Sequence, residues 1–167
     1  MTRLAALLAL SFLALGGCAN RGGVTADPGA FGAGAGAAGA LAADPSSPAY
    51  FQASVGDRVL FAVDQSTLDD AARATLAGQA RWLAANPAYA ARIEGHADEQ
   101  GTREYNLALG ARRANAVQEY LVSQGVAPGR LSTVSYGKER PIEVCSEEAC
   151  YARNRRAVTV LATGAGV

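Results

Sequence analysis

A polar segment over residues 96–106 constrains how the second half of this chain can fold. It reads His-Ala-Asp-Glu-Gln-Gly-Thr-Arg-Glu-Tyr-Asn, overlaps the end of an apolar run over residues 90–97, and continues into a helix-like run. Gly101 suits a tight turn, and Thr102 is a good N-cap for a helix that begins near Arg103. A strand, a polar turn and a long helix must therefore follow one another directly.

Strand-like and helix-like patterns alternate through residues 49–163. Runs of β-branched and aromatic residues bounded by turn residues predict strands, and apolar residues spaced three and four apart predict helices. We expect strands over residues 58–63, 90–97, 131–136 and 157–161, helices from Ser66 or Thr67 to Asn86 and from Arg103 to residue 124, and a helical turn over residues 147–151. Two helices on one mixed four-stranded sheet make an α/β sandwich that is large enough for its own core.

The first 17 residues resemble a bacterial signal peptide. Arg3 supplies a positive charge, and residues 4–15 form an apolar stretch of 12 residues, too short to span a bilayer as a helix. The following Leu-Gly-Gly-Cys resembles the lipobox of bacterial lipoproteins, so we expect Cys18 to become the acylated first residue of the mature chain. The alternative is a plain secretory signal with an incidental cysteine. Ala19 follows Cys18, and the absence of Asp there implies, by the same resemblance, sorting to the outer membrane.

Residues 18–48 are expected to form a flexible tether. From Gly29 to Ala43 every residue except Phe31 and Leu41 is Gly or Ala, so no apolar face is available for packing. About 30 such residues have a root-mean-square span of about 30 Å. A lipid at one end of this tether implies that the folded region reaches a target away from the membrane. We expect residues 164–167 to be a frayed tail.

The charge distribution argues against one class of partner. The chain has 15 Lys and Arg residues and 15 Asp and Glu residues, a formal charge of zero, and it contains no basic block. Nucleic-acid binding is therefore not expected.

Cys145 and Cys150 are the two cysteines beyond Cys18. An exported chain enters an oxidising compartment, where thiols tend to pair, and a disulfide would close the short loop Cys-Ser-Glu-Glu-Ala-Cys. A zinc site is the competing interpretation, but the chain has a single histidine and too few further ligands. We therefore expect a disulfide, and neither a metal site nor a cofactor.

Arg112 and Arg113 should face different surroundings on the second predicted helix. Steps of about 100° per residue gather one apolar arc, which we expect to be the buried face: Leu107, Gly110, Ala114, Val117 and Leu121. Arg112 lies opposite this arc and should be exposed. Arg113 lies at its boundary, beside Leu109 and Asn106, where an arginine can bury its stem and direct its guanidinium along the sheet edge.

Asp64 and Asp98 each follow a predicted strand. In α/β sheets, ligands bind beyond the strand ends and in the loops that follow. The two carboxylates and Arg113 could therefore surround a shallow pocket and bind a small zwitterion. The carboxylates would bind its ammonium group, and the guanidinium and the N–H groups of the helix start would bind its carboxylate. Alternatively, Asp98 caps the turn and pairs with Arg113 for structural reasons only.

Four segments carry motifs of a known family: residues 94–106, 109–117, 134–141 and 154–157. They resemble the peptidoglycan-associated lipoproteins, which belong to the OmpA-like C-terminal domain family, and the resemblance covers roughly residues 55–162. It implies non-covalent, non-enzymatic binding of the peptide stem of peptidoglycan through meso-diaminopimelate. The ligand-binding residues of the family correspond here to Asp64, Asp98, Leu109 and Arg113.

The sequence departs from this family at two places. The first strand of the family usually reads Phe-Asp-Phe-Asp, whereas here Phe61 is followed by Ala, Val63 and Asp64, so a small side chain replaces a ring that normally lines the pocket. The pair of cysteines near residue 148 is not general in the family. We include Val63 and Asn106 among the expected binding residues.

The resemblance also implies partners and leaves alternatives. It implies TolB and TolA of the Tol system, and a role in outer-membrane invagination at cell division. A second hypothesis is an OmpA-like lipoprotein outside the Tol system. A third is a wall hydrolase that uses His96, Asp98 or Glu99, but the sequence indicates neither a paired nucleophile nor further metal ligands. We expect His96 to be a structural residue at a strand end.

Overall fold

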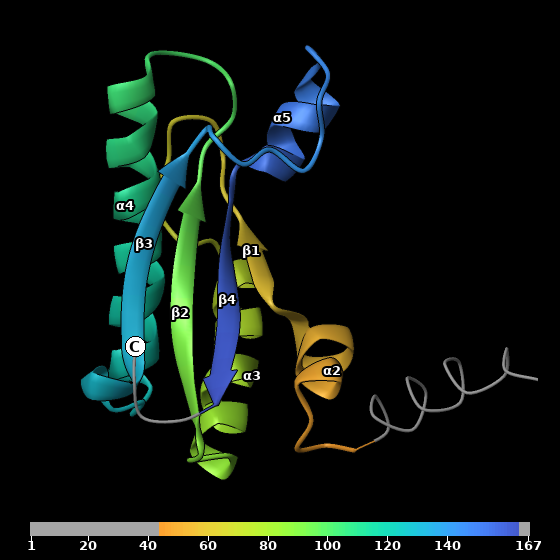
Figure 1. The fold of residues 1–167 in the computed structure, drawn as a ribbon, viewed down its shortest axis with the longest axis vertical. Coiled ribbons are helices and arrows are strands. Elements are labelled where there is room, and N and C mark those ends of the chain that lie inside the picture. The colour runs from red at the N-terminus through yellow and green to blue at the C-terminus, as the bar shows by residue number, and fades with distance from the viewer. Residues whose placement is uncertain (1–43, 164–167) are drawn as a thin grey trace, which may run out of the picture. The chain divides into compact units, whose positions relative to one another are not determined.

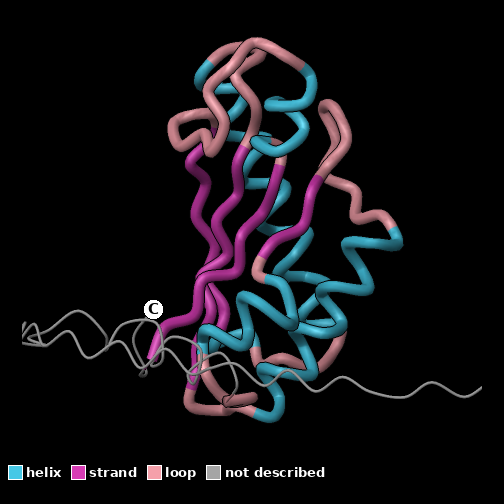
Figure 2. The backbone as a smooth tube through the Cα atoms, turned by 90° about the vertical axis from the view of Figure 1, so that its right-hand side faces the viewer, coloured by secondary structure: helices cyan, strands magenta, loops and turns pink. Residues whose placement is uncertain are grey.

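The computed structural model describes residues 44–163, in which two long helices cover one face of a four-stranded sheet (Figure 1). Figure 2 shows the strands on one side of this unit and the long helices on the other. The expected two-layer α/β architecture is therefore confirmed. The expected signal peptide, Cys18, most of the tether and the tail over residues 164–167 lie outside the described residues.

The sheet is mixed, as expected. Its strands are β1 (Arg58–Leu60), β2 (Tyr89–His96), β3 (Leu131–Gly137) and β4 (Arg156–Thr163), in the spatial order β1-β4-β2-β3. Strands β2 and β3 are parallel, and β4 pairs antiparallel with both β1 and β2. The last strand therefore lies inside the sheet, and its first residues come next to the ends of β1 and β2.

The first strand is shorter than expected, because it ends at Leu60 and not at Val63. Leu60 pairs with Arg156, the first residue of β4, and beyond it the Phe61 N–H donates to the Arg155 carbonyl at 2.9 Å, the last backbone bond between the two segments on this side. The chain then turns, with the Gln65 N–H donating to the Ala62 carbonyl at 3.2 Å. The shortening matters because it turns Ala62 to Gln65 into a loop instead of a strand end.

Helix α3 (Asp70–Ala85) begins later than expected. Its N-cap is Asp69, whose carboxylate accepts the Ala72 N–H at 2.7 Å, and not Ser66 or Thr67. The loop over residues 61–69 is longer as a result. The expected apolar stripe of the helix is buried: Ala72, Leu76, Ala80 and Leu83. Before β1, the short α2 (Pro48–Tyr50) and the π-helical η1 (Phe51–Gly56) pack on α3. The carbonyl of Pro45, in the expected tether, accepts the Trp82 indole N–H at 2.7 Å.

Helix α4 (Arg103–Ser123) has the expected N-cap, Thr102, which accepts the Tyr105 N–H at 3.2 Å. Its buried face differs from the expected one: it consists of Asn106, Leu109, Gly110, Arg113, Ala114, Val117 and Leu121. The prediction was wrong for Leu107, which is 39% exposed, and for Arg113, which is fully buried and not at the boundary.

A close glycine contact explains this rotation of α4. A Cβ atom added at Gly95 of β2 would lie 1.8 Å from the Gly110 carbonyl oxygen, so neither strand nor helix has room for a side chain there. Gly110 is thus the point at which the helix backbone rests on the sheet. Residues one turn to either side, Asn106 and Arg113, must then face inward because of the helical repeat.

The segment between β3 and β4 contains α5 (Glu148–Asn154), which is longer than the expected turn. The expected disulfide joins Cys145 to Cys150 with a Cα–Cα distance of 6.0 Å. Asn154, fully buried at the end of α5, accepts the N–H groups of Ile142 and Glu143 and donates to the Glu143 carbonyl. The 3-10 turn η2 (Pro128–Arg130) connects α4 to β3. Within residues 44–163, no helix is long and apolar enough to cross a membrane.

Candidate functional site

A pocket of about 280 Å³ opens beside the N-terminal half of α4, where the loop after β1 meets the turn after β2. Five of the six residues that we expected to bind a ligand line it. The lining consists of Val63, Asp64, Asp98, Gln100, Gly101, Tyr105, Asn106 and Leu109. Arg113, the sixth expected residue, does not line the pocket but lies behind it. The structure therefore brings five of the six side chains together around one pocket and places Arg113 outside its lining, and their binding of a ligand stays a prediction.

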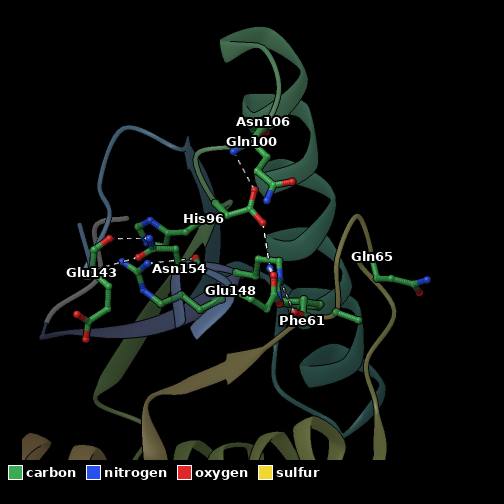
Figure 3. Close-up of polar contacts among 12 residues, drawn as sticks. Phe61, Gln65, His96, Gln100, Asn106, Glu143, Glu148 and Asn154 are labelled. Atoms are coloured by element: carbon green, nitrogen blue, oxygen red, sulfur yellow. Dashed lines mark hydrogen bonds and ion pairs between the residues drawn. The ribbon is translucent and has the colours of Figure 1, made fainter. Parts of the chain in front are cut away.

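Asp98 is the buried carboxylate of the pocket, with 8% of its surface exposed. Its Oδ1 accepts the backbone N–H of Gln100 at 3.2 Å, which is the turn-capping contact that we considered. Its Oδ2 accepts a hydrogen bond from Arg155 Nη1 at 3.1 Å, so its ion pair is with Arg155 and not with Arg113. Figure 3 shows Gln100 at one end of this line of polar contacts and Glu148 at the other.

Arg113 binds three backbone carbonyls behind the pocket, two in the loop after β1 and one at the end of β2. Its Nε donates to the Gln65 carbonyl at 2.8 Å, its Nη1 to the His96 carbonyl at 2.8 Å, and its Nη2 to the Ala62 carbonyl at 3.2 Å. Its guanidinium also lies 5.1 Å from the centre of the Phe61 ring. Burial lowers the pKa of Arg113 to about 10, an effect that the Asp98 charge opposes, so the side chain remains charged at neutral pH. Arg113 therefore fixes the loop that carries Val63 and Asp64.

Asp64 is the exposed carboxylate at the rim of the pocket. Its backbone φ is 56°, in the left-handed region that Asp and Asn tolerate better than most residues. The Tyr105 hydroxyl, from the first turn of α4, donates a hydrogen bond to its Oδ1. That hydrogen bond raises the pKa of Tyr105. The loop after β1 is thus connected to α4 at two points, through Arg113 inside and through Tyr105 at the surface.

The floor and the far wall of the pocket are well ordered by hydrogen bonds. Leu109 is buried and apolar. The Asn106 amide donates to the Gln100 carbonyl at 2.7 Å, and the Lys138 ammonium, from the turn after β3, donates to the Gly101 carbonyl at 2.7 Å. Val63, by contrast, is 57% exposed, so the position where the family has a ring adds little cover to the pocket.

Arg155 is the residue of this site that sequence reasoning missed. It lies just before β4, is 4% exposed, and donates to Asp98, to Glu148 of α5 and to the Phe61 carbonyl. Its partners are 57, 7 and 94 residues away in the chain, so no local pattern indicates them. The available signal was the pair Arg155-Arg156 at the start of a strand. Because adjacent residues of a strand face opposite sides of a sheet, the two arginines should have different surroundings.

His96 does not have the surroundings of a catalytic residue. Its imidazole is buried beside Tyr136, with the ring centroids 5.5 Å apart, and its Nδ1 has no hydrogen-bond partner within residues 44–163. Burial, with the positive charges of Arg156 and Arg140, lowers its pKa to about 4, so the ring is neutral at neutral pH. No group of three His, Cys, Asp or Glu side chains among the described residues is arranged to hold a metal ion.

The charges of the pocket are arranged to bind a cationic group next to an apolar one. Two carboxylates, Asp64 and Asp98, face the pocket, and two guanidinium groups lie behind them. An ammonium group could replace the Tyr105 hydroxyl on Asp64 and share Asp98, because charge-assisted hydrogen bonds are about twice as strong as neutral ones. A carbon chain attached to that ammonium would lie on Leu109.

Comparison with known proteins gives the family of the chain. Residues 60–155 match the model of the OmpA family. The "Peptidoglycan-associated lipoprotein" of Rhizobium meliloti (strain 1021) is 54% identical over 154 residues, covering 92% of this chain and 84% of that protein. The protein of the same name from Pseudomonas aeruginosa is 44% identical over 157 residues, covering 90% of this chain and 92% of that protein.

Solved structures agree with these relatives. The crystal structure of the peptidoglycan-associated lipoprotein from Burkholderia pseudomallei superposes with a TM-score of 0.65 at 38% identity, covering 73% of this chain and 99% of that one. The C-terminal domain of Helicobacter pylori MotB, at 22% identity and a TM-score of 0.61 over 65% of this chain and 86% of that one, shares the fold. The resemblance drawn from the sequence motifs is confirmed: this chain belongs to the OmpA family, among the peptidoglycan-associated lipoproteins.

Proposed function

We propose that this chain is an outer-membrane lipoprotein that binds the diaminopimelate-containing stem peptide of peptidoglycan without catalysis. Binding of this kind would anchor the outer membrane to the cell wall. The observation that carries the proposal is the pocket, in which two carboxylates from different loops lie beside the apolar floor of Leu109. The names of the relatives support association with peptidoglycan.

The side chain of diaminopimelate ends in an ammonium and a carboxylate on one carbon, and the pocket suits both groups. The ammonium would lie between Asp64 and Asp98. The carboxylate would face the positive charge of Arg113 and the free N–H groups at the start of α4. Arg113 then acts mainly through its charge and through the loop that it holds, because its guanidinium already donates to three carbonyls.

Asp64→Asn is the sharpest test of this proposal. Asn tolerates the left-handed backbone at this position, and the side chain is exposed, so the fold should be unaffected. We expect the variant to bind isolated sacculi about tenfold more weakly, the loss typical of one charge-assisted contact. The measurement is co-sedimentation of the purified full-length chain with sacculi, with thermal unfolding as a check of the fold.

Glu104→Gln is the matched control for this experiment. Glu104 is exposed in the first turn of α4 and does not line the pocket, and its substitution removes one negative charge, as Asp64→Asn does. It should bind like the unaltered chain. Equal retention of Asp64→Asn and Glu104→Gln on sacculi would show that the pocket is not the binding site.

Asp98→Asn should weaken binding as well, but its interpretation needs more care. It removes the buried carboxylate partner of Arg155 at 3.1 Å and leaves only the exposed Glu148, and this lowers stability as well as affinity. Its affinity should therefore be measured well below its own unfolding temperature.

Two further elements of the proposal rest on the family alone. The first is acylation of Cys18, and the second is membership of the Tol system, with TolB and TolA as partners and a role in cell division. The alternative is an OmpA-like lipoprotein that binds peptidoglycan outside the Tol system. Co-purification of TolB with the chain from solubilised envelopes would favour the first, and its absence from an otherwise intact preparation would favour the second.

A wall hydrolase is the competing function, and the surroundings of His96 argue against it. A buried, neutral imidazole beside Tyr136 is not placed to activate a nucleophile or a water molecule in the pocket. Prolonged incubation of the chain with sacculi should release no soluble muropeptides. Their release at a rate that depends on His96 would contradict the proposal of a binding protein.

A further inference from the structure

Glu148 is the one carboxylate of the α5 segment that reaches the pocket arginines. It is the first residue of α5, and both of its carboxylate oxygens accept hydrogen bonds from Arg155, Oε1 from Nη2 and Oε2 from Nη1 at 3.4 Å. The Glu148 side chain is 65% exposed, whereas that of Arg155 is 5% exposed. The Arg155 guanidinium lowers the pKa of Glu148, so the carboxyl is ionised across the neutral range.

Arg155 is shared between two carboxylates. Its Nη1 donates to Asp98 Oδ2 at 3.1 Å and to Glu148 Oε2 at 3.4 Å, so one nitrogen contacts both partners. Burial alone would lower the pKa of Arg155, but the hydrogen bonds that it donates to Glu148 and Asp98 outweigh burial and raise its pKa above the usual value. The guanidinium is therefore a permanent positive charge that the two carboxylates divide between them.

This sharing changes the charge that Asp98 presents to a ligand. With Asp98 alone, Arg155 would neutralise the carboxylate completely and leave little attraction for an ammonium group. With Glu148 also present, two negative charges surround one positive charge, and Asp98 retains part of its charge for the pocket. Asp98 and Arg155 are mostly buried, so salt screens their interaction little, whereas the charge of the exposed Glu148 is screened more.

The disulfide explains how an exposed glutamate can keep this position. Exposed ion pairs are weak when both side chains are free to move. Glu148 lies inside the loop closed by Cys145 and Cys150, and the same segment is held by the three hydrogen bonds of Asn154 to Ile142 and Glu143. The backbone of Glu148 is thus held in place by contacts that do not involve its own side chain.

We propose that Glu148 and Arg155 are positioning residues that tune the affinity of the pocket for a cationic ligand group, and that the Cys145–Cys150 disulfide holds Glu148 in place for this role. The inference rests on the proposed function, because the ligand group in question is the ammonium of the stem peptide. It assigns a purpose to a disulfide that lies outside the pocket.

The test compares Glu148→Gln with Glu147→Gln. The two substitutions remove the same charge from adjacent residues, but Glu147 makes no side-chain cap bond and does not contact Arg155. The probes are two soluble stem peptides that end in meso-diaminopimelate, one with its side-chain amine free and one with that amine acetylated. Affinities are measured by calorimetry on the full-length chain, together with the unfolding temperature.

We expect Glu148→Gln to bind the free-amine peptide about threefold more weakly, in keeping with one partly exposed ion pair. Glu147→Gln should be unchanged, and neither variant should alter the weaker binding of the acetylated peptide. A loss that is equal for both peptides would indicate a general structural effect and would overturn the proposal. So would equal affinities of the two variants for the free-amine peptide.

A second arm tests the disulfide. The double variant Cys145→Ser, Cys150→Ser should weaken binding of the free-amine peptide to the same extent as Glu148→Gln. Combining the three substitutions should cause no further loss, because all of them act through Arg155. An additive loss, or no loss in the double variant, would show that the disulfide has no part in positioning Glu148.

These outcomes can be separated from failure of the proposed function. If the unaltered chain binds the free-amine peptide and Asp64→Asn does not, the pocket is correct, and the Glu148 comparison decides the further inference alone. If the unaltered chain fails to bind the peptide, the proposed function is wrong and the inference is overturned with it.

Discussion

Two arginines lie behind the same pocket, and their surroundings differ in kind. Arg113, on α4, donates to three backbone carbonyls, whereas Arg155, before β4, donates to two carboxylates and one carbonyl. Both are almost completely buried. The α4 side of the pocket therefore contains a cation held by dipoles, and the α5 side contains a cation held by charges.

This difference gives Arg113 a structural role and leaves the charge around Arg155 adjustable. Backbone carbonyls cannot be titrated or removed, so Arg113 has a constant charge and a constant geometry, and its loss would disturb both the loop after β1 and the end of β2. Carboxylates can be neutralised one at a time, so the charge around Arg155 can be adjusted without a change of fold. We therefore expect substitution of Arg113 to affect mainly stability, and neutralisation of Glu148, the exposed partner of Arg155, to affect mainly affinity.

The largest expected effect is that of Arg113→Met on stability. The substitution removes the charged donor of the buried His96 carbonyl and of the Gln65 carbonyl, whereas the Ala62 carbonyl keeps the Gln65 N–H, and we expect a loss of about 3 kcal/mol in the free energy of unfolding. Urea denaturation measures it. Arg112→Met, at the exposed neighbour, is the control and should change stability by less than about 0.5 kcal/mol. If Arg113→Met is as stable as the unaltered chain, Arg113 does not have the structural role that distinguishes it from Arg155.

The pH dependence of stability should come partly from His96, which contacts both sides. Its carbonyl accepts from Arg113, and its imidazole faces Arg156, Arg140 and Glu94. The pKa of its ring is lowered from 6.5 to about 4 in the folded chain, so below pH 6.5 the unfolded chain binds more protons than the folded one. Stability should therefore fall as the pH is lowered from 6.5 towards 4, by up to about 3 kcal/mol in total.

His96→Gln isolates this contribution. The variant lacks the titrating ring, so the difference in unfolding free energy between it and the unaltered chain should change over the window from pH 6.5 to 4. Both chains contain the same carboxylates, so their own titration cancels in the difference. A difference that stays constant with pH would mean that the ring is not buried in its neutral form.

Removal of the disulfide should have a moderate effect on stability. The chain-entropy model gives about 2 kcal/mol for a loop of this length. The double variant Cys145→Ser, Cys150→Ser should therefore unfold at lower urea concentration, with an unchanged dependence on urea. Reducing agent should lower the urea concentration at which the unaltered chain unfolds and should not change that of the double variant. A double variant as stable as the unaltered chain would show that the hydrogen bonds of Asn154 hold this segment without help.

The smallest expected effect is a gain in affinity from Val63→Phe. Val63 is 57% exposed at the pocket rim, and a ring there would cover more of the carbon chain of a bound ligand. We expect binding of sacculi to strengthen by about 1 kcal/mol, roughly fivefold. Val144→Phe, at a site that is 86% exposed and outside the pocket, is the control. Equal affinities of the two variants would mean that the rim of the α4 side does not contact the ligand.

Much of the fold could be predicted because it depends on local patterns. The Thr102 cap, the apolar stripe of α3 and the end of β2 shortly before Asp98 follow from neighbouring residues. So does the pairing of Cys145 with Cys150, because they lie only five positions apart. These interactions join residues that are close in the sequence, and at such positions the residue types involved favour one local structure.

The errors have a common physical cause, which is contact between distant segments. The phase of α4 was wrong because Gly110 rests on Gly95 of β2, and helix periodicity alone cannot show which residue touches a sheet. The first strand was predicted too long because its pairing with the segment that leads into β4 stops after the bond from the Phe61 N–H to the Arg155 carbonyl. In both cases the partner that decides the outcome lies on another element.

The sequence by itself determined the architecture, the family and the side chains that line the pocket, because patterns of residue type over short distances are enough for these. Only the tertiary structure decided what the buried charges do. In the folded chain, Arg113 donates to three backbone carbonyls, and Asp98 pairs with Arg155, which is 57 residues away in the sequence. A buried charge takes the partners that the packed backbone brings within reach, and those partners are settled only when the sheet and helices are assembled.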